Sequence, residues 1–317
     1  TFAVNAPKII KKTGIKFDLI HGVTQTLSQD IYRVGGGCHW DYMMHTYPLM
    51  QSTTGKIIMC LNPRHLSILL LEGIIFKRKR YKQITCISEQ CKKEIMHHYK
   101  LSSNDIEVVY NGVDIHSFTP QNRQRYRDII RSKHAVKEDE VLLLFVGSGF
   151  KRKGLKHVIA ALSIIDSHKK VKLLVVGRGK ARGYQRLAKE KGVLNRLIFA
   201  GLHKHIQEIY AAGDIFVFPS EYDAFGTACL EAMASGLPVI VSNTSGVSEI
   251  ITHGKDGFII NHPIDAKEIA NNIHVLLEKE TREQMGIDAR QKSEMYSFEA
   301  NVEKTLRIYK KVLNITI

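Results

Sequence analysis

The sequence contains little cysteine and no long apolar run. Its five cysteines are odd in number and lie without the spacing of a metal site or a disulfide framework, so we expect reduced, intracellular thiols. The longest apolar stretch, residues 66–76, is interrupted by Ser67, Glu72 and Gly73 and is far shorter than the roughly 20 residues that span a bilayer. These two deficits exclude a disulfide-stapled fold and a single membrane-spanning helix.

The sequence also has fewer acidic residues than basic ones. Lysine and arginine number 46, and aspartate and glutamate 31, which gives a formal net charge of +15 at pH 7. A surplus of this size predicts an acidic partner, which could be nucleic acid, an anionic membrane surface or a phosphorylated substrate. No RNP-like, zinc-finger or helix-turn-helix pattern is present, so nucleic acid is the least favoured of the three.

Length and composition predict two domains. Hydrophobic residues make up 44% of the 317 residues, which is enough for two cores. In the second half, apolar strands alternate with helices, as in a doubly wound α/β sheet. The strands expected there are residues 141–146, 171–176, 197–200, 215–219 and 237–242, and the helices are 155–163, 184–191, 205–212, 227–235, 266–279 and 282–293. The rest of the chain is expected to hold strands 17–21, 82–87 and 106–110 and helices 64–80, 89–99 and 298–313.

The most informative stretch is residues 214–257, where a buried strand, a loop and a short helix follow one another. Ligands of open parallel sheets bind at the carboxyl ends of the strands, where this loop is placed. Asp223 lies in the loop and Glu231 interrupts the apolar helix, so we favour a pair of acceptors for sugar hydroxyls. Backbone N–H groups near Gly226 and Thr227 then point at an anion. The alternative is an acid that complements the helix dipole and a partly exposed glutamate.

A second loop, GSGFKRKG at 147–154, connects the expected strand 141–146 to a helix. Two glycines alone would be weak evidence for a ligand. Lys151, Arg152 and Lys153 add positive charge to the backbone N–H groups and the positive helix end, so phosphate binding is the favoured interpretation.

A run of three glycines ending at Gly37 directly precedes Cys38 and His39. A triple glycine lets the backbone approach a ligand closely, and an adjacent imidazole can bind hydroxyls or phosphate. The alternative is a flexible loop with a surface histidine. His21, at the end of an expected strand, is a weaker candidate of the same kind.

A dense basic cluster closes the expected helix 64–80. A solvated helix end is the usual explanation of such a cluster, but docking on anionic lipid headgroups ranks above nucleic-acid binding for this chain. The membrane patch comprises Lys77, Arg78, Lys79, Arg80 and Lys82.

Three segments carry a family resemblance: PSEYDAFGTACLEAMASGLPVI, DIYRVGGGCHWDYM and FVGSGFKRKG. The first resembles the signature of retaining GT-B glycosyltransferases of the sucrose-synthase-like and glycogen-synthase-like clan, which has two glutamates. Asp223 stands at the position of the first glutamate and Glu231 at that of the second. The resemblance extends over nearly the whole chain and is strongest to the lipopolysaccharide-core glucosyltransferases that act on the inner-core heptose.

The resemblance implies a GT-B fold, in which two Rossmann-like, doubly wound domains face each other across a cleft. The acceptor domain is expected at 1–118, the nucleotide-sugar-binding domain at 119–297, and a helix at 298–317 that crosses back onto the first domain. Such a fold opens with a strand and a glycine-rich loop, whereas residues 1–16 are basic and helix-like. We therefore expect the first strands, and part of the acceptor site with them, to be missing.

The resemblance also implies roles for individual residues. It assigns Arg152 and Lys153 to the donor diphosphate, Glu231 to the ribose and Asp223 to the sugar hydroxyls. His39 and Asp223 are the catalytic candidates, and Gly36 and Gly37 line the cleft beside His39. The remaining donor contacts are expected from Gly147, Gly177, Arg178, His205, Ile206, Phe225, Gly226 and Thr227.

The implied reaction is retaining transfer of a hexose, glucose from UDP-glucose, to a lipid-linked, lipopolysaccharide inner-core-like acceptor. We expect a peripheral enzyme on the cytoplasmic face of the plasma membrane. No Asp-x-Asp motif occurs, so we expect neither a metal nor any cofactor besides the nucleotide sugar. The open alternatives are a same-clan enzyme with another donor or a lipid or glycan acceptor, and a nucleotide-sugar-binding protein without turnover.

Overall fold

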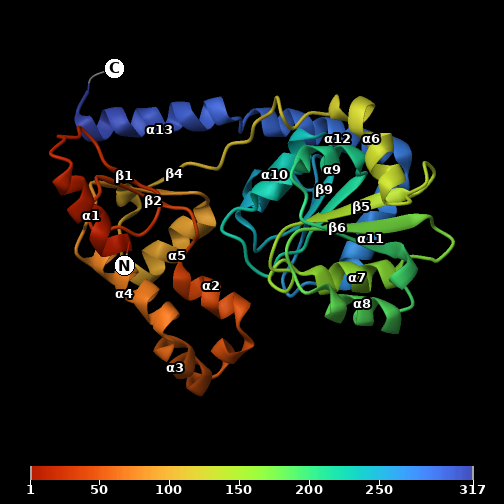
Figure 1. The fold of residues 1–317 in the computed structure, drawn as a ribbon, viewed down its shortest axis with the longest axis horizontal. Coiled ribbons are helices and arrows are strands. Elements are labelled where there is room, and N and C mark those ends of the chain that lie inside the picture. The colour runs from red at the N-terminus through yellow and green to blue at the C-terminus, as the bar shows by residue number, and fades with distance from the viewer. Residues whose placement is uncertain (1, 316–317) are drawn as a thin grey trace. The chain divides into compact units, whose positions relative to one another are not determined.

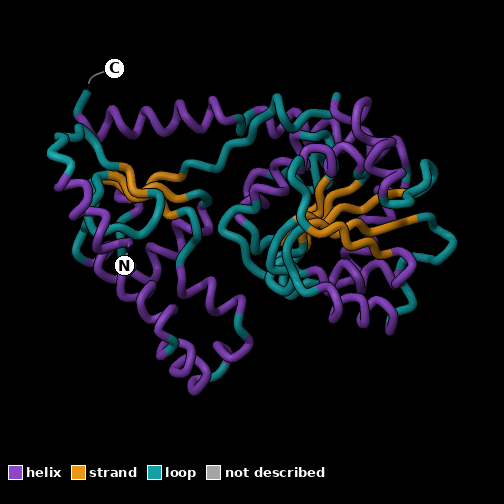
Figure 2. The backbone as a smooth tube through the Cα atoms, in the orientation of Figure 1, coloured by secondary structure: helices purple, strands orange, loops and turns teal. Residues whose placement is uncertain are grey.

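The computed structural model describes residues 2–315 and divides the chain into two compact units. The N-terminal unit comprises Thr1–Asn111 and Glu299–Ile317, and the C-terminal unit comprises Gly112–Phe298. Each unit has its own parallel sheet with helices packed on it, so both are Rossmann-like and the expected α/β class is confirmed (Figure 1, Figure 2). Residue 1, which begins the expected segment 1–118, and residues 316–317, which end the expected segment 298–317, lie outside the described residues.

The sheet of the N-terminal unit has four parallel strands in the order β1-β2-β3-β4. The strands are short: β1 His21–Gly22, β2 Ile31–Val34, β3 Gln83–Cys86 and β4 Ile106–Val108. The helices of this unit are α1 Phe2–Lys12, α2 His39–Thr46, α3 Thr53–Leu61, α4 Pro63–Lys77, α5 Glu89–Tyr99 and α13 Phe298–Leu313, with 3-10 turns at Pro48–Gln51 and Ser103–Asp105. The main core of the unit lies between the sheet and the helices α4 and α5.

The C-terminal helix α13 packs in the N-terminal unit. Its Ile308 is buried together with Ile31 of β2 and Val109, which follows β4. The amide Nδ2 of Asn301 donates a hydrogen bond to the backbone oxygen of Tyr110 at 2.5 Å. These contacts tie the last helix to the sheet formed by the first third of the chain.

One expectation for the N-terminal unit was wrong, and one of its strands was not anticipated. Of the strand expected at 17–21, only His21 lies in β1. The N–H of Ile20 donates to the side chain of Asp30 at 2.9 Å, so this hydrogen bond is not available for strand pairing. The strand β2 was not anticipated, because the glycines that follow it gave the whole stretch the pattern of a loop.

The sheet of the C-terminal unit has six parallel strands in the order β10-β9-β8-β5-β6-β7. Its strands are β5 Val141–Val146, β6 Val171–Val176, β7 Leu197–Gly201, β8 Ile215–Phe218, β9 Val239–Ser242 and β10 Phe258–Ile260. Its helices are α6 Asn122–Lys133, α7 Leu155–Ile164, α8 Ala181–Glu190, α9 Ile206–Ala212, α10 Thr227–Ala234, α11 Ala266–Leu277 and α12 Lys279–Glu294, with 3-10 turns at Leu194–Arg196 and Gly246–Ile250. The five strands expected here are confirmed, whereas β10 and α6 were not anticipated.

The strand order reverses between β5 and β8. From β5 the chain builds the sheet outward through β6 and β7, and it then returns to add β8, β9 and β10 on the other side. The loops that follow β5 and β8 meet at this point. Gly154, with φ +76°, lies so close to Pro219 that a Cβ would come within 1.8 Å of the Pro219 carbonyl oxygen. Open α/β sheets bind their ligands at such a switch point.

Among the described residues, no single helix is both long and apolar enough to cross a membrane. The helices α3 and α4 meet the requirements of length and composition only when taken together, and a bend of 86° separates them.

Candidate functional site

The first part of the candidate site is formed by the loops after β5 and β6. The N–H of Gly149 donates to the oxygen of Arg178 at 3.1 Å, and the N–H of Arg178 donates to the Ser148 hydroxyl at 3.1 Å. A Cβ on Gly177 would lie 2.2 Å from the Gly147 oxygen, so only glycine permits this approach. The two predicted loops therefore form one surface at the carboxyl edge of the sheet, on which Arg178 is exposed.

An ion-pair cluster joins the loop after β5 to the loop after β8. Arg152 lies 2.9 Å from the carboxylate Oδ2 of Asp223, and the ammonium group of Lys153 pairs with the same oxygen. The Asp223 side chain is only 13% exposed. Burial raises the pKa of Asp223, but the charges of Lys153 and Arg152 outweigh this effect and hold the pKa below its ordinary value. Asp223 is therefore ionised at neutral pH.

Arg152 and Lys153 were assigned to the diphosphate and Asp223 to the sugar hydroxyls, whereas in the structure both cations contact Asp223. Arg152 also donates to the backbone oxygen of Tyr222 at 2.7 Å. Lys153 lies 4.4 Å above the centroid of the Phe218 ring, and burial lowers its pKa despite the charge of Asp223. We call the loops 147–154 and 219–226, with this cluster, the switch-point site.

Glu231 lies on α10, just beyond the switch-point site. Its Oε2 accepts a hydrogen bond from the Tyr210 hydroxyl at 2.8 Å. Its other carboxylate oxygen, Oε1, has no hydrogen-bond partner among the described residues. Burial raises the pKa of Glu231, and the hydrogen bond from Tyr210 opposes this effect. The carboxylate thus keeps an acceptor that the protein does not use.

The other predicted donor contacts lie at the same edge of the sheet. Gly226, with φ +98°, begins α10 and offers no side chain to cap the helix, and Thr227 is exposed in its first turn. Phe225 is buried, and its N–H donates to Asp223 Oδ1 at 3.3 Å. Ile206 is the first residue of α9 and follows β7. His205 precedes it without a side-chain cap.

Sequence reasoning gave no role to Glu221, which lies in the switch-point site. Its Oε1 is 2.9 Å from Nε2 of His157 and 3.0 Å from the ammonium group of Lys156. The hydrogen bond from His157 and the charge of Lys156 lower the pKa of Glu221 to about 2. The signal was present in the sequence, because Glu221 shares the loop after β8 with Asp223.

A second group of ionisable residues lies in the N-terminal unit around His39. Nε2 of His39 is 3.0 Å from Nδ1 of His65, and the ring of Tyr42 stacks on the His39 imidazole at a centroid distance of 5.7 Å. Burial, followed by the neighbouring His65 and Arg64, lowers the pKa of His39 to about 4. The imidazole is therefore neutral at physiological pH, when it can both donate and accept a hydrogen bond.

Glu72 supports this group and was missed. It is 2% exposed on α4 and accepts hydrogen bonds from the His39 N–H at 3.3 Å and from the Tyr99 hydroxyl at 2.8 Å. Burial raises its pKa to about 7, although those hydrogen bonds oppose the shift. In the sequence Glu72 stood out only as an interruption of an apolar run, yet a lone acid in such a run indicates a paired buried carboxylate.

Near His39, the glycine run leads into α2. Gly36 has open space around it, and Gly37 takes a positive φ of +76°. Among the described residues, Cys38, Asp41 and His98 could hold a metal ion, since one ligand atom from each lies within 4.8 Å of the others. Spacing along the chain could not show this group, because His98 comes from α5.

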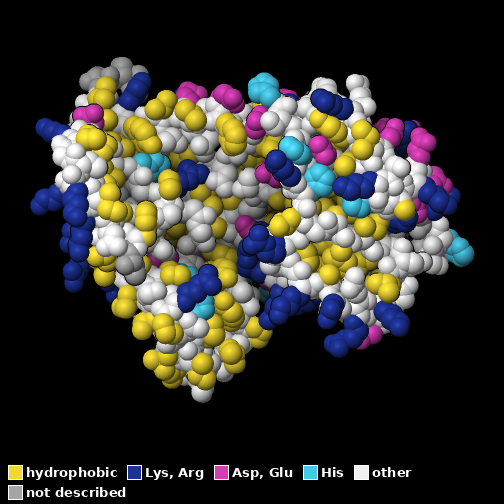
Figure 3. All heavy atoms as spheres, in the orientation of Figure 1, with side chains coloured by type: hydrophobic (Ala, Val, Ile, Leu, Met, Phe, Trp, Pro, Cys, Tyr) yellow, Lys and Arg dark blue, Asp and Glu magenta, His cyan; other side chains and the backbone are white. Residues whose placement is uncertain are grey.

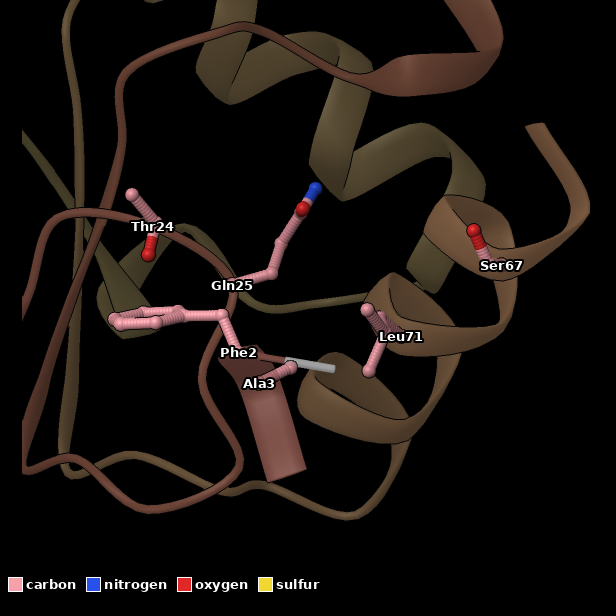
Figure 4. Close-up of a pocket in the computed structure, with 6 residues that line it drawn as sticks. All are labelled: Phe2, Ala3, Thr24, Gln25, Ser67 and Leu71. Carbon is pink, nitrogen blue, oxygen red and sulfur yellow. The ribbon is translucent and has the colours of Figure 1, made fainter. Parts of the chain in front are cut away.

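Two further features of the N-terminal unit are less suited to chemistry. Nδ1 of the candidate His21 is 2.7 Å from the Tyr309 hydroxyl of α13, so this histidine joins β1 to the last helix. A hollow of about 480 Å³ lies beside α1 and α4 (Figure 4). It is lined by Phe2, Ala3, Thr24, Gln25, Ser67 and Leu71 and offers no ionisable side chain.

Comparison with known proteins defines the class. Residues 126–292 match the family described as glycosyl transferases group 1, and residues 1–117 match glycosyltransferase family 4. The crystal structure of WaaG, a glycosyltransferase involved in lipopolysaccharide biosynthesis, superposes with a TM-score of 0.81 at 23% identity, over 96% of this chain and 80% of that one. HepE from Anabaena in complex with UDP-glucose superposes with a TM-score of 0.76 at 20% identity, over 96% and 81%. The two units thus form a GT-B fold.

The chain belongs to the group 1 glycosyltransferases. A glycosyltransferase of Methanocaldococcus jannaschii is 30% identical over 72% of this chain and 60% of its own length. The lipopolysaccharide glucosyltransferase WaaG of Escherichia coli is 26% identical over 80% and 66%. N-acetyl-alpha-D-glucosaminyl L-malate synthase of Bacillus anthracis is 28% identical over 73% and 60%. The chain therefore spans about 60 to 66% of the length of these curated relatives.

Proposed function

We propose that this glycosyltransferase moves glucose from UDP-glucose to a lipid-linked, lipopolysaccharide inner-core-like acceptor, with retention of configuration. The observation that carries the proposal is the switch-point site. There Arg152 and Lys153 both contact Asp223 at the carboxyl edge of a parallel sheet, which is the edge at which such sheets bind nucleotides. Relatives with the same fold bind UDP-glucose or are named for lipopolysaccharide glucosyl transfer, which supports this donor and acceptor over others.

The donor contacts follow from the chemistry of the site. Glu231 accepts the ribose hydroxyls through its unused Oε1, because a carboxylate can take two adjacent hydroxyl donors. Arg152 and Lys153 bind the diphosphate and stabilise the charge that builds up on it as the glycosidic bond breaks. Asp223 positions both cations through Oδ2 and accepts a sugar hydroxyl. The donor contacts need no divalent metal under this proposal, because the two cations do that work.

In this proposal His39 binds a sugar hydroxyl of the substrate. Its pKa of about 4 keeps the imidazole neutral, so it can hydrogen-bond a sugar hydroxyl without adding positive charge. Glu72 accepts the N–H of His39 and fixes the start of α2, so Glu72 is a positioning residue.

We also propose that the protein works at the cytoplasmic face of the plasma membrane, docked through the membrane patch. All five basic side chains are exposed, and two of them face acids: Lys79 lies 4.0 Å from Asp105 and Lys82 lies 3.0 Å from Asp30. The other three have no ion-pair partner among the described residues. Hydrophobic side chains also gather on the surface over α3, where Ile57, Ile58 and Leu61 are more than half exposed (Figure 3). Basic and apolar surfaces together suit an anionic bilayer.

The test is to incubate the protein with radiolabelled UDP-glucose and a heptose-terminated lipid acceptor, and to determine the anomeric configuration of the product. Transfer with an α-linked product is expected, because the donor linkage is α. A product with inverted configuration would overturn the retaining assignment. Binding of UDP-glucose without transfer to any lipid or glycan acceptor would favour a nucleotide-sugar-binding protein.

A further inference from the structure

A cavity of about 960 Å³ lies within the C-terminal unit, away from the switch-point site. Asp214, which lines it, immediately precedes β8, and Gly236 and Pro238 precede β9. The cavity is therefore at the amino edge of the sheet, whereas the switch-point site is at the carboxyl edge. Residues of α6 and α12 complete its wall.

Several arginines line this cavity, and the buried carboxylate of Asp214 is already paired. Asp214 is paired with Arg127 at 2.7 Å and with Arg131 at 3.1 Å, and it accepts the N–H of Leu142 at 2.8 Å. Burial raises the pKa of Asp214, but the charge of Arg127, the Leu142 N–H and Arg131 hold it below its ordinary value. Asp214 can therefore neutralise no further cation.

Two more arginines of the cavity have no carboxylate partner among the described residues. Arg123 donates one hydrogen bond, to the Gly213 oxygen at 2.7 Å. Arg282 donates through one nitrogen to the oxygens of Leu276 at 2.7 Å and Leu277 at 3.1 Å. A guanidinium group has five N–H donors, so most donors of both side chains are unused.

Two of the three glutamates that line the cavity are paired with other cations, and the third, Glu138, is exposed. Glu294 is paired with Arg290 at 2.8 Å, and Glu283 with Lys279 at 3.8 Å. Burial lowers the pKa of Arg123 to about 10, and repulsion by the positive charge of Arg127 is a smaller cause in the same direction. An anion in the cavity would relieve this repulsion.

We propose that this cavity binds a small, soluble phosphate ester, with the phosphate held by Arg123 and Arg282. Guanidinium groups match phosphate oxygens through paired N–H donors. The volume suits a ligand of nucleotide or sugar-phosphate size. Ile287, Pro120 and Pro238 supply an apolar wall for the rest of the ester. The competing explanation is purely structural: Arg123 and Arg282 cap the carbonyl ends of α9 and α11.

Substitutions at Ile287 separate these explanations, because they leave both caps in place. Ile287 lines the cavity and is 53% exposed, so it tolerates a charge of either sign. Ribose 5-phosphate and inorganic phosphate are titrated by calorimetry into the full chain, with UDP present in saturating amounts to fill the proposed donor site. We expect saturable binding that Ile287→Glu weakens and Ile287→Lys strengthens, each several-fold. The double variant Arg123→Gln/Arg282→Gln should lose about tenfold or more per guanidinium group.

Three outcomes would overturn the proposal. One is the absence of saturable binding of either probe by the wild-type protein. Another is an isotherm that is the same for Ile287→Glu and Ile287→Lys, which decides the question even where the double arginine variant does not fold. The third is binding that depends on the charge at position 287 only when the ligand is a vesicle containing phosphatidic acid, because the ligand would then be a lipid headgroup.

Discussion

Glu231→Gln is the substitution that most directly probes the proposed donor site. The carboxylate is largely buried, and Oε1 has no partner among the described residues, so its unused acceptor is available to a ribose. Hydrogen bonds to a charged group contribute about 1.5 to 3 kcal/mol, so UDP affinity should fall roughly ten- to a hundredfold. Calorimetry with UDP measures this loss.

Folding should survive the change. The glutamine oxygen can still accept the hydrogen bond from Tyr210, and the substitution removes a charge that burial disfavours. The melting temperature of the variant should therefore be equal to that of the wild-type protein or slightly higher.

Tyr210→Phe is the matched control. It removes the 2.8 Å hydrogen bond to Glu231 and leaves the carboxylate in place. Loss of one such bond costs about 1 kcal/mol, which corresponds to a fall of about 2 to 4 °C in the melting temperature. UDP affinity should change far less than in Glu231→Gln. If Glu231→Gln instead melts earlier and binds UDP with unchanged affinity, Glu231 is a structural acid and the ribose assignment is refuted.

Three further predictions address the metal, the membrane and the buried acid of the N-terminal unit. UDP affinity should be the same with EDTA and with Mg²⁺, because Arg152 and Lys153 supply the positive charge; complete loss in EDTA would contradict this. Changing Lys77, Arg78 and Arg80 to Gln should lower the affinity for anionic vesicles by about two decades. Changing the exposed Lys189, Lys191 and Lys204 to Gln should not. Equal effects of the two triple variants would refute the role of the membrane patch. Because burial raises the pKa of Glu72 from 4.5 to about 7, the folded state holds a proton that the unfolded chain releases. The wild-type protein should therefore lose up to roughly 3 kcal/mol of stability as the pH rises from 4.5 to about 7, and Glu72→Gln should not. Urea unfolding curves of the wild-type protein that coincide at these two pH values would contradict this.

The C-terminal unit could be predicted from the sequence nearly element by element. Strands such as β5 and β6 are continuous apolar runs, as expected of strands buried on both faces, and their bounds agree with the prediction. β10 was not anticipated, because its three residues follow a glycine-rich turn and give too short a pattern. In the N-terminal unit, α5 begins at residue 89 as expected, and Ser88 caps it by accepting the N–H of Cys91.

The N-terminal sheet was harder to predict because its strands are very short. β1 has two residues and β4 has three, so alternation or apolar runs cannot develop. The neighbours of His39 were also not predictable, because they are distant from it in the sequence. His65 and Glu72 come from α4 and Tyr99 from α5, and no spacing in the sequence brings these residues together.

The two acids of the family signature show what spacing along the chain leaves out. Asp223 and Glu231 form one motif in the sequence, but their environments displace their pKa values in opposite directions. Asp223 is held ionised by cations from the loop after β5, whereas Glu231 is desolvated on α10 with one tyrosine beside it. Pairs of acids separated in this way take different roles. Asp223 keeps its charge throughout the physiological range, whereas burial raises the pKa of Glu231, so of the two acids Glu231 is the one whose protonation should weaken UDP binding as the pH falls. Glu231→Gln should therefore abolish that pH dependence, and a dependence that persists in the variant would show that another group controls it.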